Sequence, residues 1–130
     1  MVVNVYNCIS ILISILIGSI IGAERQYHKH DAGIRTFTLI CLGSTLAMII
    51  STNLSYGDPG RIAAQVVSGI SFLGAGIIMH SKDKVYGLTT AACTWITSII
   101  GLAIGCNMYI EGIMITAVMI ILLSLFNKFK

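Results

Sequence analysis

The chain has 130 residues, of which 56% are hydrophobic and only 10% are charged, whereas a soluble domain usually carries about 25% charged residues. The 8 basic and 5 acidic side chains are too few to cover a water-facing surface, so the composition predicts an integral membrane protein embedded in a lipid bilayer. The net charge of +3 comes from basic residues scattered along the chain, which argues against nucleic-acid binding.

Five apolar segments follow one another, and each is long enough to cross the bilayer as a helix, which takes about 20 residues. They cover residues 5–23, 34–52, 62–79, 88–105 and 109–127. We therefore expect an all-α membrane bundle of about five transmembrane helices, forming a single domain. Because only residues 128–130 follow the last segment in this sequence, we expect no soluble C-terminal domain.

The first segment ends in a pair of charges, and the second begins beside another. Glu24 and Arg25 close the first span, and Arg35 and Thr36 open the second. Charges near lipid are costly and often functional, so these four residues are candidate functional positions. Interfacial anchoring is the alternative explanation for each charge.

The third segment begins with Asp58-Pro59-Gly60-Arg61, which is typical of a helix start with Asp58 as N-cap and Pro59 as the first helical residue. Beyond it, Arg61, Gln65 and Ser68 fall on one helical face. A Gln inside a membrane helix needs a hydrogen-bond partner, so we expect this face to point into the bundle.

The fourth segment carries a similar stripe of hydroxyl groups at Thr90, Thr94 and Thr97. Together with the polar face of the third segment, this stripe predicts a buried polar seam between spans three and four. Interhelical hydrogen bonding explains such a seam, and a path for a solute or ion is the alternative.

Small residues recur about one turn apart in several spans, which lets helix backbones approach closely in lipid. The candidate packing positions are Gly18, Gly22, Gly69, Gly74, Gly76, Gly101 and Gly105. Packing within one bundle accounts for these rows. Alternatively, one row faces a second copy of the chain in a homodimer.

Lys and Arg are distributed unevenly between the two sides of the membrane if the spans alternate in direction. Only Arg61 falls on one side, and the other side receives Arg25, Lys29, Arg35, Lys82, Lys84, Lys128 and Lys130. Since cytosolic loops carry the excess of basic residues, the sequence predicts an external N-terminus and a cytosolic C-terminus.

Enzyme chemistry has little support in the sequence. No phosphate-binding loop of the GxxxxGK(S/T) kind occurs, and the cysteines lack metal-ligand spacing. His28 and His30 could bind a metal only weakly and are more typical of a solvated loop. We expect no enzymatic activity, no cofactor and no metal site.

Four strings carry a family resemblance that spans about residues 18–105. They are GAERQY (22–27), AGIRTFTLICLGS (32–44), DPGRIAAQVVSGISFLGAGIIM (58–79) and GLTTAACTW (87–95). In these strings the chain resembles the MgtC/SapB family of bacterial membrane proteins. The matching residues include Thr89 and Thr90 of the last string, besides the charged candidates named above.

The resemblance implies a location in the bacterial cytoplasmic (inner) membrane and a role in adaptation to low magnesium and in virulence. One family member is reported to restrain the F-type ATP synthase, which implies a membrane protein partner. Two features differ from many members. Tyr86 replaces a basic residue before the GLTTAA string, and the soluble domain that often follows the bundle is not in this sequence.

Of two functions, the sequence favours a regulator that binds another membrane complex, which suits a chain that is nearly all bundle. The alternative is a small dimeric transporter or channel for an ion or small solute, which the polar seam suggests.

Overall fold

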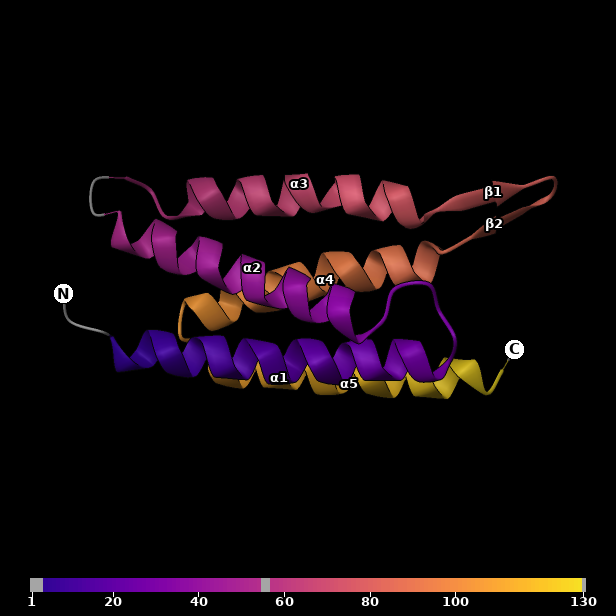
Figure 1. The fold of residues 1–130 in the computed structure, drawn as a ribbon, viewed down its shortest axis with the longest axis horizontal. Coiled ribbons are helices and arrows are strands. Elements are labelled where there is room, and N and C mark those ends of the chain that lie inside the picture. The colour runs from indigo at the N-terminus through magenta and orange to yellow at the C-terminus, as the bar shows by residue number, and fades with distance from the viewer. Residues whose placement is uncertain (1–3, 55–56, 130) are drawn as a thin grey trace.

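The computed structural model describes residues 4–54 and 57–129 as a bundle of five antiparallel helices, which confirms the all-α prediction (Figure 1). Each helix is long and apolar enough to cross a membrane. The helices are α1 (Val5–Tyr27), α2 (Ile34–Asn53), α3 (Gly60–Ile77), α4 (Leu88–Gly105) and α5 (Tyr109–Asn127).

Because consecutive helices run in opposite directions, the bundle has two distinct ends (Figure 1). We call one the hairpin end, where the α1–α2 loop, the connection between α3 and α4, and the last turn of α5 lie. The other is the Asp58 end, with the start of α1, the α2–α3 connection and the α4–α5 turn.

Helix α1 extends beyond the predicted end at Ala23 and continues to Tyr27. The reason is that Arg25 is buried in its last turn rather than lying in a solvated loop. At the start of α3 the prediction was one residue too early, because Pro59 rather than Asp58 occupies the N-cap position and Gly60 is the first helical residue. Asp58 still supports this helix start, since its Oδ1 accepts the Gly60 N–H at 2.8 Å. Pro59 has helical dihedral angles (φ −58°, ψ −25°).

The break between α3 and α4 folds into a β-hairpin, which the sequence analysis did not predict. Strand β1 (Met79–Ser81) pairs antiparallel with β2 (Lys84–Tyr86) and projects beyond the helices (Figure 1). Gly87 then turns the chain into α4 with a φ of 86°, and a Cβ there would lie 2.5 Å from the Ile77 carbonyl oxygen. Glycine is required at this position for both reasons.

The core of the bundle is built from α1, α2 and α4, which hold the buried apolar cluster that includes Ile21, Phe37 and Ile104. Four of the predicted packing glycines make these helices meet. A Cβ at Gly18 or Gly22 would lie 2.6 or 2.5 Å from a backbone Cα atom of α2. Gly101 and Gly105 of α4 lie equally close to α2.

Helices α3 and α5 lie at the periphery of this core. No residue along the described helix α3 is buried, and α5 buries only Gly112, Thr116 and Met119. Among the predicted packing glycines of α3, Gly69 and Gly76 face open space, and Gly74 makes only an ordinary contact with Ala91. The small residues of α3 therefore leave a free surface on the single chain.

Candidate functional site

The most completely built polar site lies at the hairpin end and centres on Arg25, which is only 2% exposed. Its Nη2 donates a hydrogen bond to Thr90 Oγ1 at 2.9 Å, across the contact between α1 and α4. Its Nη1 lies 3.8 Å from Glu24 Oε2, an ion pair that is too long for a hydrogen bond.

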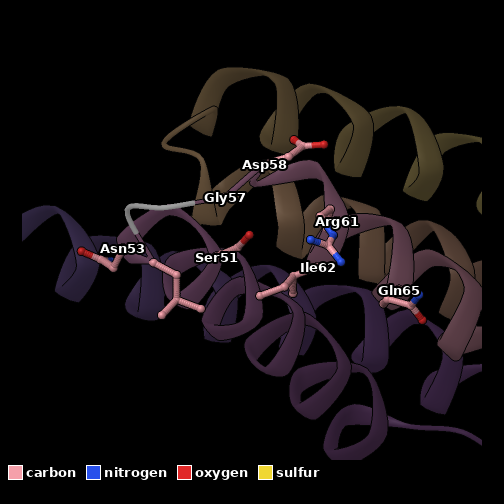
Figure 2. Close-up of a pocket in the computed structure, with 8 residues that line it drawn as sticks. Ser51, Asn53, Gly57, Asp58, Arg61, Ile62 and Gln65 are labelled. Carbon is pink, nitrogen blue, oxygen red and sulfur yellow. The ribbon is translucent and has the colours of Figure 1, made fainter.

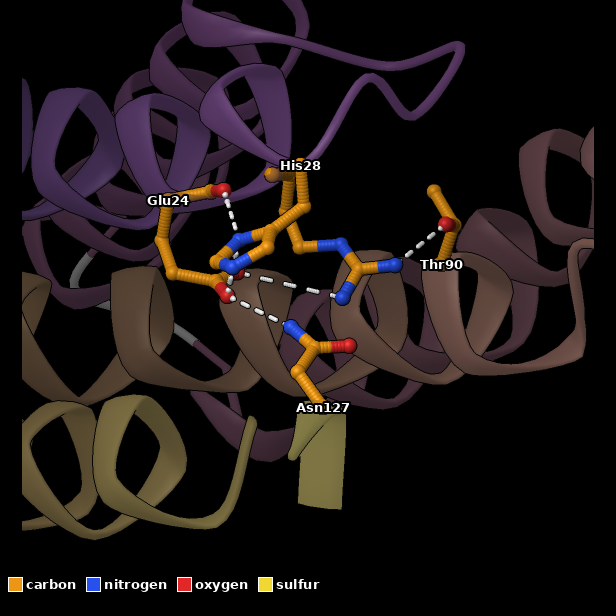
Figure 3. A network of polar contacts seen from close by, with 5 residues as sticks. Glu24, His28, Thr90 and Asn127 are labelled. Atoms are coloured by element: carbon orange, nitrogen blue, oxygen red, sulfur yellow. Dashed lines mark hydrogen bonds and ion pairs between the residues drawn. The ribbon is translucent and has the colours of Figure 1, made fainter. Parts of the chain in front are cut away.

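Glu24 is held from two other sides (Figure 3). Its Oε1 lies 2.9 Å from His28 Nδ1, one helical turn further along α1. The same oxygen accepts a long hydrogen bond of 3.5 Å from Asn127 Nδ2 in α5. The network therefore joins α1, α4 and α5, and its acidic member is 9% exposed.

Two atoms of this network are buried without a hydrogen-bond partner among the described residues, Glu24 Oε2 and Arg25 Nε. Beside them lies a cavity of about 370 Å³ between the ends of α1, α4 and α5. It is lined by Arg25, His30, Thr89, Leu122, Leu123, Phe126 and Asn127. We call it the Arg25 cavity.

The structure thus brings together residues from the end of span one and the start of span four, namely Glu24, Arg25, Thr89 and Thr90. Sequence analysis missed His28 and Asn127 as members. The spacing of His28 four residues after Glu24 was a usable signal, since such residues are neighbours on a helix. No local pattern linked Asn127 to Glu24, which lies 103 residues earlier.

Arg35 and Thr36 do not join this network. Arg35 is exposed in the first turn of α2. Thr36 is half-buried and lines a separate depression of about 310 Å³, together with Gly76 of α3 and Asp31.

At the Asp58 end, a cavity of about 700 Å³ lies between the end of α2 and the start of α3 (Figure 2). It is lined by Ser51, Asn53, Leu54, Gly57, Asp58, Arg61, Ile62 and Gln65. Ser51 Oγ donates to the Pro59 carbonyl oxygen at 2.8 Å and so ties the two helices together.

The predicted inward orientation of the α3 polar face is wrong for the single chain. Arg61, Gln65 and Ser68 are all exposed. The aliphatic side of α3 packs inward instead, with Val66 and Ile70 next to α2. Packing the hydrophobic face of α3 against α2 is favourable in free energy, so the polar face remains exposed on the single chain.

The predicted seam between spans three and four consequently exists on α4 alone. Thr90, Thr94 and Thr97 are all buried. Thr94 and Thr97 donate to carbonyl oxygens of their own helix at 2.7 Å. These two hydroxyl groups are therefore satisfied without a partner in α3.

No group of three or more potential metal ligands of the His, Cys, Asp or Glu type occurs in residues 4–54 and 57–129. The polar groups at the two ends of the bundle differ in how deeply they are buried. The hairpin end holds a buried ion pair beside a cavity, and the Asp58 end holds an open, exposed cavity.

Comparison with known proteins identifies relatives over nearly the whole chain. Residues 11–130 match the model of the MgtC family. The chain is 41% identical to "Protein MgtC" of Salmonella typhimurium over 112 residues, which cover 86% of this chain and 48% of that protein. It is 43% identical to "Putative magnesium transporter YhiD" of Escherichia coli over 130 residues, covering 91% of this chain and 59% of that protein.

An uncharacterized protein of Haemophilus influenzae is 36% identical over 125 residues, which cover 88% of this chain and 52% of the relative. The chain spans about half the length of these curated relatives. No solved structure matches it significantly.

Proposed function

The chain belongs to the MgtC family, and from that premise we propose that it acts in bacterial adaptation to low magnesium by binding another membrane protein. The names of two relatives, MgtC and putative magnesium transporter YhiD, connect the family with magnesium. A role as a regulator requires a binding surface and no reaction, so we also propose that the chain is not an enzyme.

The observation that supports this proposal is the exposed polar face of α3. Gln65 lies four residues after Arg61, about 6 Å deeper along the helix. A side-chain amide facing lipid loses its hydrogen bonds, which costs several kcal/mol by the order of magnitude measured for apolar solvents, about 4–8. A partner helix with polar groups at the same depth would remove that cost.

Two partners suit this face. In a homodimer with its axis along the membrane normal, the two copies of Gln65 would meet at equal depth, and an amide both donates and accepts hydrogen bonds. The open positions Gly69 and Gly76 would allow close approach. The F-type ATP synthase, which the family resemblance suggests, is the heterologous partner to test.

We expect Gly69→Leu to abolish or strongly reduce partner binding while leaving the single chain folded, because nothing lies within 4 Å of a Cβ at Gly69. The measurement is copurification after crosslinking in native membranes, with Ala117→Leu on the exposed face of α5 as the matched control. Equal copurification of wild type and Gly69→Leu would rule out α3 as the binding surface.

A transporter is the second candidate, and the open cavity at the Asp58 end favours it. Asp58 and Arg61 line that cavity with Gln65. An anion suits Arg61 better than magnesium does, since magnesium prefers several oxygen ligands in octahedral geometry. Purified protein in liposomes should then show solute flux that Arg61→Ala and Asp58→Ala reduce. A regulator would show no flux in the same assay.

We further propose that the chain lies in the cytoplasmic membrane with the hairpin end in the cytosol. Among the described residues, the hairpin end carries Arg25, Lys29, Arg35, Lys82, Lys84 and Lys128, whereas the Asp58 end carries Arg61. The excess of basic residues on the cytosolic side is the general rule for short loops.

Cys106 provides a test of this orientation, because it is exposed in the α4–α5 turn at the Asp58 end. In a Cys8→Ser background, a membrane-impermeant maleimide added to spheroplasts should label Cys106. Partial burial raises the pKa of the Cys106 thiol, so less reactive thiolate is present at neutral pH and labelling should accelerate as the pH rises. Labelling only after lysis would reverse the topology.

A further inference from the structure

We propose that the Arg25 cavity binds a phosphate group, supplied either by an acidic phospholipid headgroup or by free phosphate. This proposal does not depend on α3 or on the regulatory role, because the cavity lies at the opposite end of the bundle from Arg61 and Gln65. The site is formed by Arg25, by the start of α4 and by side chains of α5.

Arg25 has unused capacity to donate hydrogen bonds. A guanidinium carries five N–H donors. Within residues 4–54 and 57–129, its side chain forms one hydrogen bond, from Nη2 to Thr90, and its Nε is buried without a partner. Glu24 lies at 3.8 Å, so it offsets the charge without accepting a hydrogen bond from Nη1. Phosphate oxygens match the planar donor array of arginine particularly well.

The start of α4 adds partial positive charge beside the same cavity. Its first helical backbone bond runs from Ala91 N–H to the Gly87 carbonyl, so the preceding N–H groups of Leu88, Thr89 and Thr90 have no acceptor within the helix. Gly87 has no side chain to cap them. Helix N-termini of this kind stabilise bound anions.

The opposite wall of the cavity comes from the last turns of α5 and is largely apolar, with Leu122, Leu123 and Phe126. Asn127 adds one amide beside them. An apolar wall next to a phosphate-binding group suits the junction between a lipid headgroup and its acyl chains. Basic pockets between membrane helices on the cytosolic side commonly hold such headgroups.

The surrounding charges permit an anion here. Glu24 is the acidic residue of the network, and its Oε1 is engaged by His28 and Asn127. Its Oε2 is buried without a hydrogen-bond partner among the described residues and lies on the Nη1 side of Arg25, at 3.8 Å, so an anion would bind on the Nε side of the guanidinium. Lys128 directly follows Asn127 and is exposed. A bound phosphate would therefore meet Arg25 and the N-terminus of α4, whose Thr89 lines the cavity.

The test uses the full chain in nanodiscs of phosphatidylcholine containing increasing phosphatidylglycerol, with bound lipid counted by native mass spectrometry. Arg25→Gln should weaken phosphatidylglycerol retention by roughly tenfold, as expected for losing a hydrogen bond to a charged group. Leu123→Trp should also weaken retention, because the larger side chain would fill the cavity that Leu123 lines. Arg35→Gln, an exposed arginine at the same end, should retain it like wild type. Leu123→Trp keeps the test valid if Arg25→Gln does not fold.

A parallel titration with inorganic phosphate in neutral detergent distinguishes the two sources. If phosphate raises the unfolding midpoint of wild type but not of Leu123→Trp, and displaces phosphatidylglycerol, the site takes free phosphate. If neither probe distinguishes wild type from Leu123→Trp, the proposal is wrong. It is also wrong if Arg35→Gln reduces lipid retention as much as Arg25→Gln, because binding would then reflect general surface charge.

Discussion

Alanine at Gly22 should destabilise the protein by about 1–3 kcal/mol, the usual cost of overpacking a well-packed interior, although alanine normally favours a helix by about 1 kcal/mol over glycine. The added Cβ would lie 2.5 Å from Ile34 Cα and 2.9 Å from the Gly33 carbonyl oxygen. Both are backbone atoms, so no side-chain rotation relieves the clash and α1 must move away from α2.

The loss should increase when Gly18→Ala is added, because a Cβ there meets Thr38 Cα at 2.6 Å in the same contact between α1 and α2. Unfolding by sodium dodecyl sulfate, followed by circular dichroism, measures the change in a detergent-solubilised sample. Gly43→Ala is the matched control, since nothing lies within 4 Å of its Cβ position. Equal midpoints for Gly22→Ala and Gly43→Ala would contradict the close packing of α1 on α2.

Removing the charge of Arg25 should have the largest effect of any single polar substitution, about 3–5 kcal/mol, as for other buried pairs that lose one partner. Arg25→Gln leaves Glu24, which is 9% exposed, without its positive neighbour and deletes the hydrogen bond to Thr90. Glu24→Gln leaves Arg25 buried without its counter-charge. The double substitution should cost less than the sum of the two singles.

Thermal unfolding in a neutral detergent, applied to wild type, both single variants and the double variant, yields the coupling energy directly. It should be performed without phosphate or acidic lipid, so that the internal ion pair is measured separately from any bound ligand. Glu111→Gln, an exposed acid in the first turn of α5, controls for the loss of a carboxylate. Additive losses from Glu24→Gln and Arg25→Gln would show that the pair is not coupled.

Hydrophobic length made the five helices predictable from the sequence. The predicted spans 88–105 and 109–127 coincide with α4 and α5, because abrupt polar or turn-forming residues bound them. The start of α3 was predictable to within one residue, since Asp58 and Pro59 act within two residues of the helix that begins at Gly60.

The packing of the helices against one another was harder to predict from the sequence. The pattern of Arg61, Gln65 and Ser68 defines a helical face, but periodicity does not say whether that face meets the same chain or another molecule. In the single chain, Val66 and Ile70 supply the inward face instead. The network at the hairpin end was only partly predicted for a related reason, because Glu24 and Asn127 become neighbours through tertiary packing alone.

The hairpin between α3 and α4 was missed although local signals existed. Val85 and Tyr86 favour strands, and Lys82-Asp83 can form the turn. In a chain of this composition, however, a short polar break between two apolar segments is just as typical of a plain loop. The observed register pairs Met79 with Tyr86, and residue preferences alone do not specify it.

The link between Arg25 and Thr90 also constrains the order of biogenesis. The two residues are 65 positions apart in sequence, so α1 and α2 can insert and pair through Gly18 and Gly22 well before α4 has left the ribosome. During that interval the guanidinium has to remain in contact with water or lipid headgroups. The core is completed only when α4 inserts. The nascent chain is therefore most vulnerable to proteolysis or chaperone capture before that step.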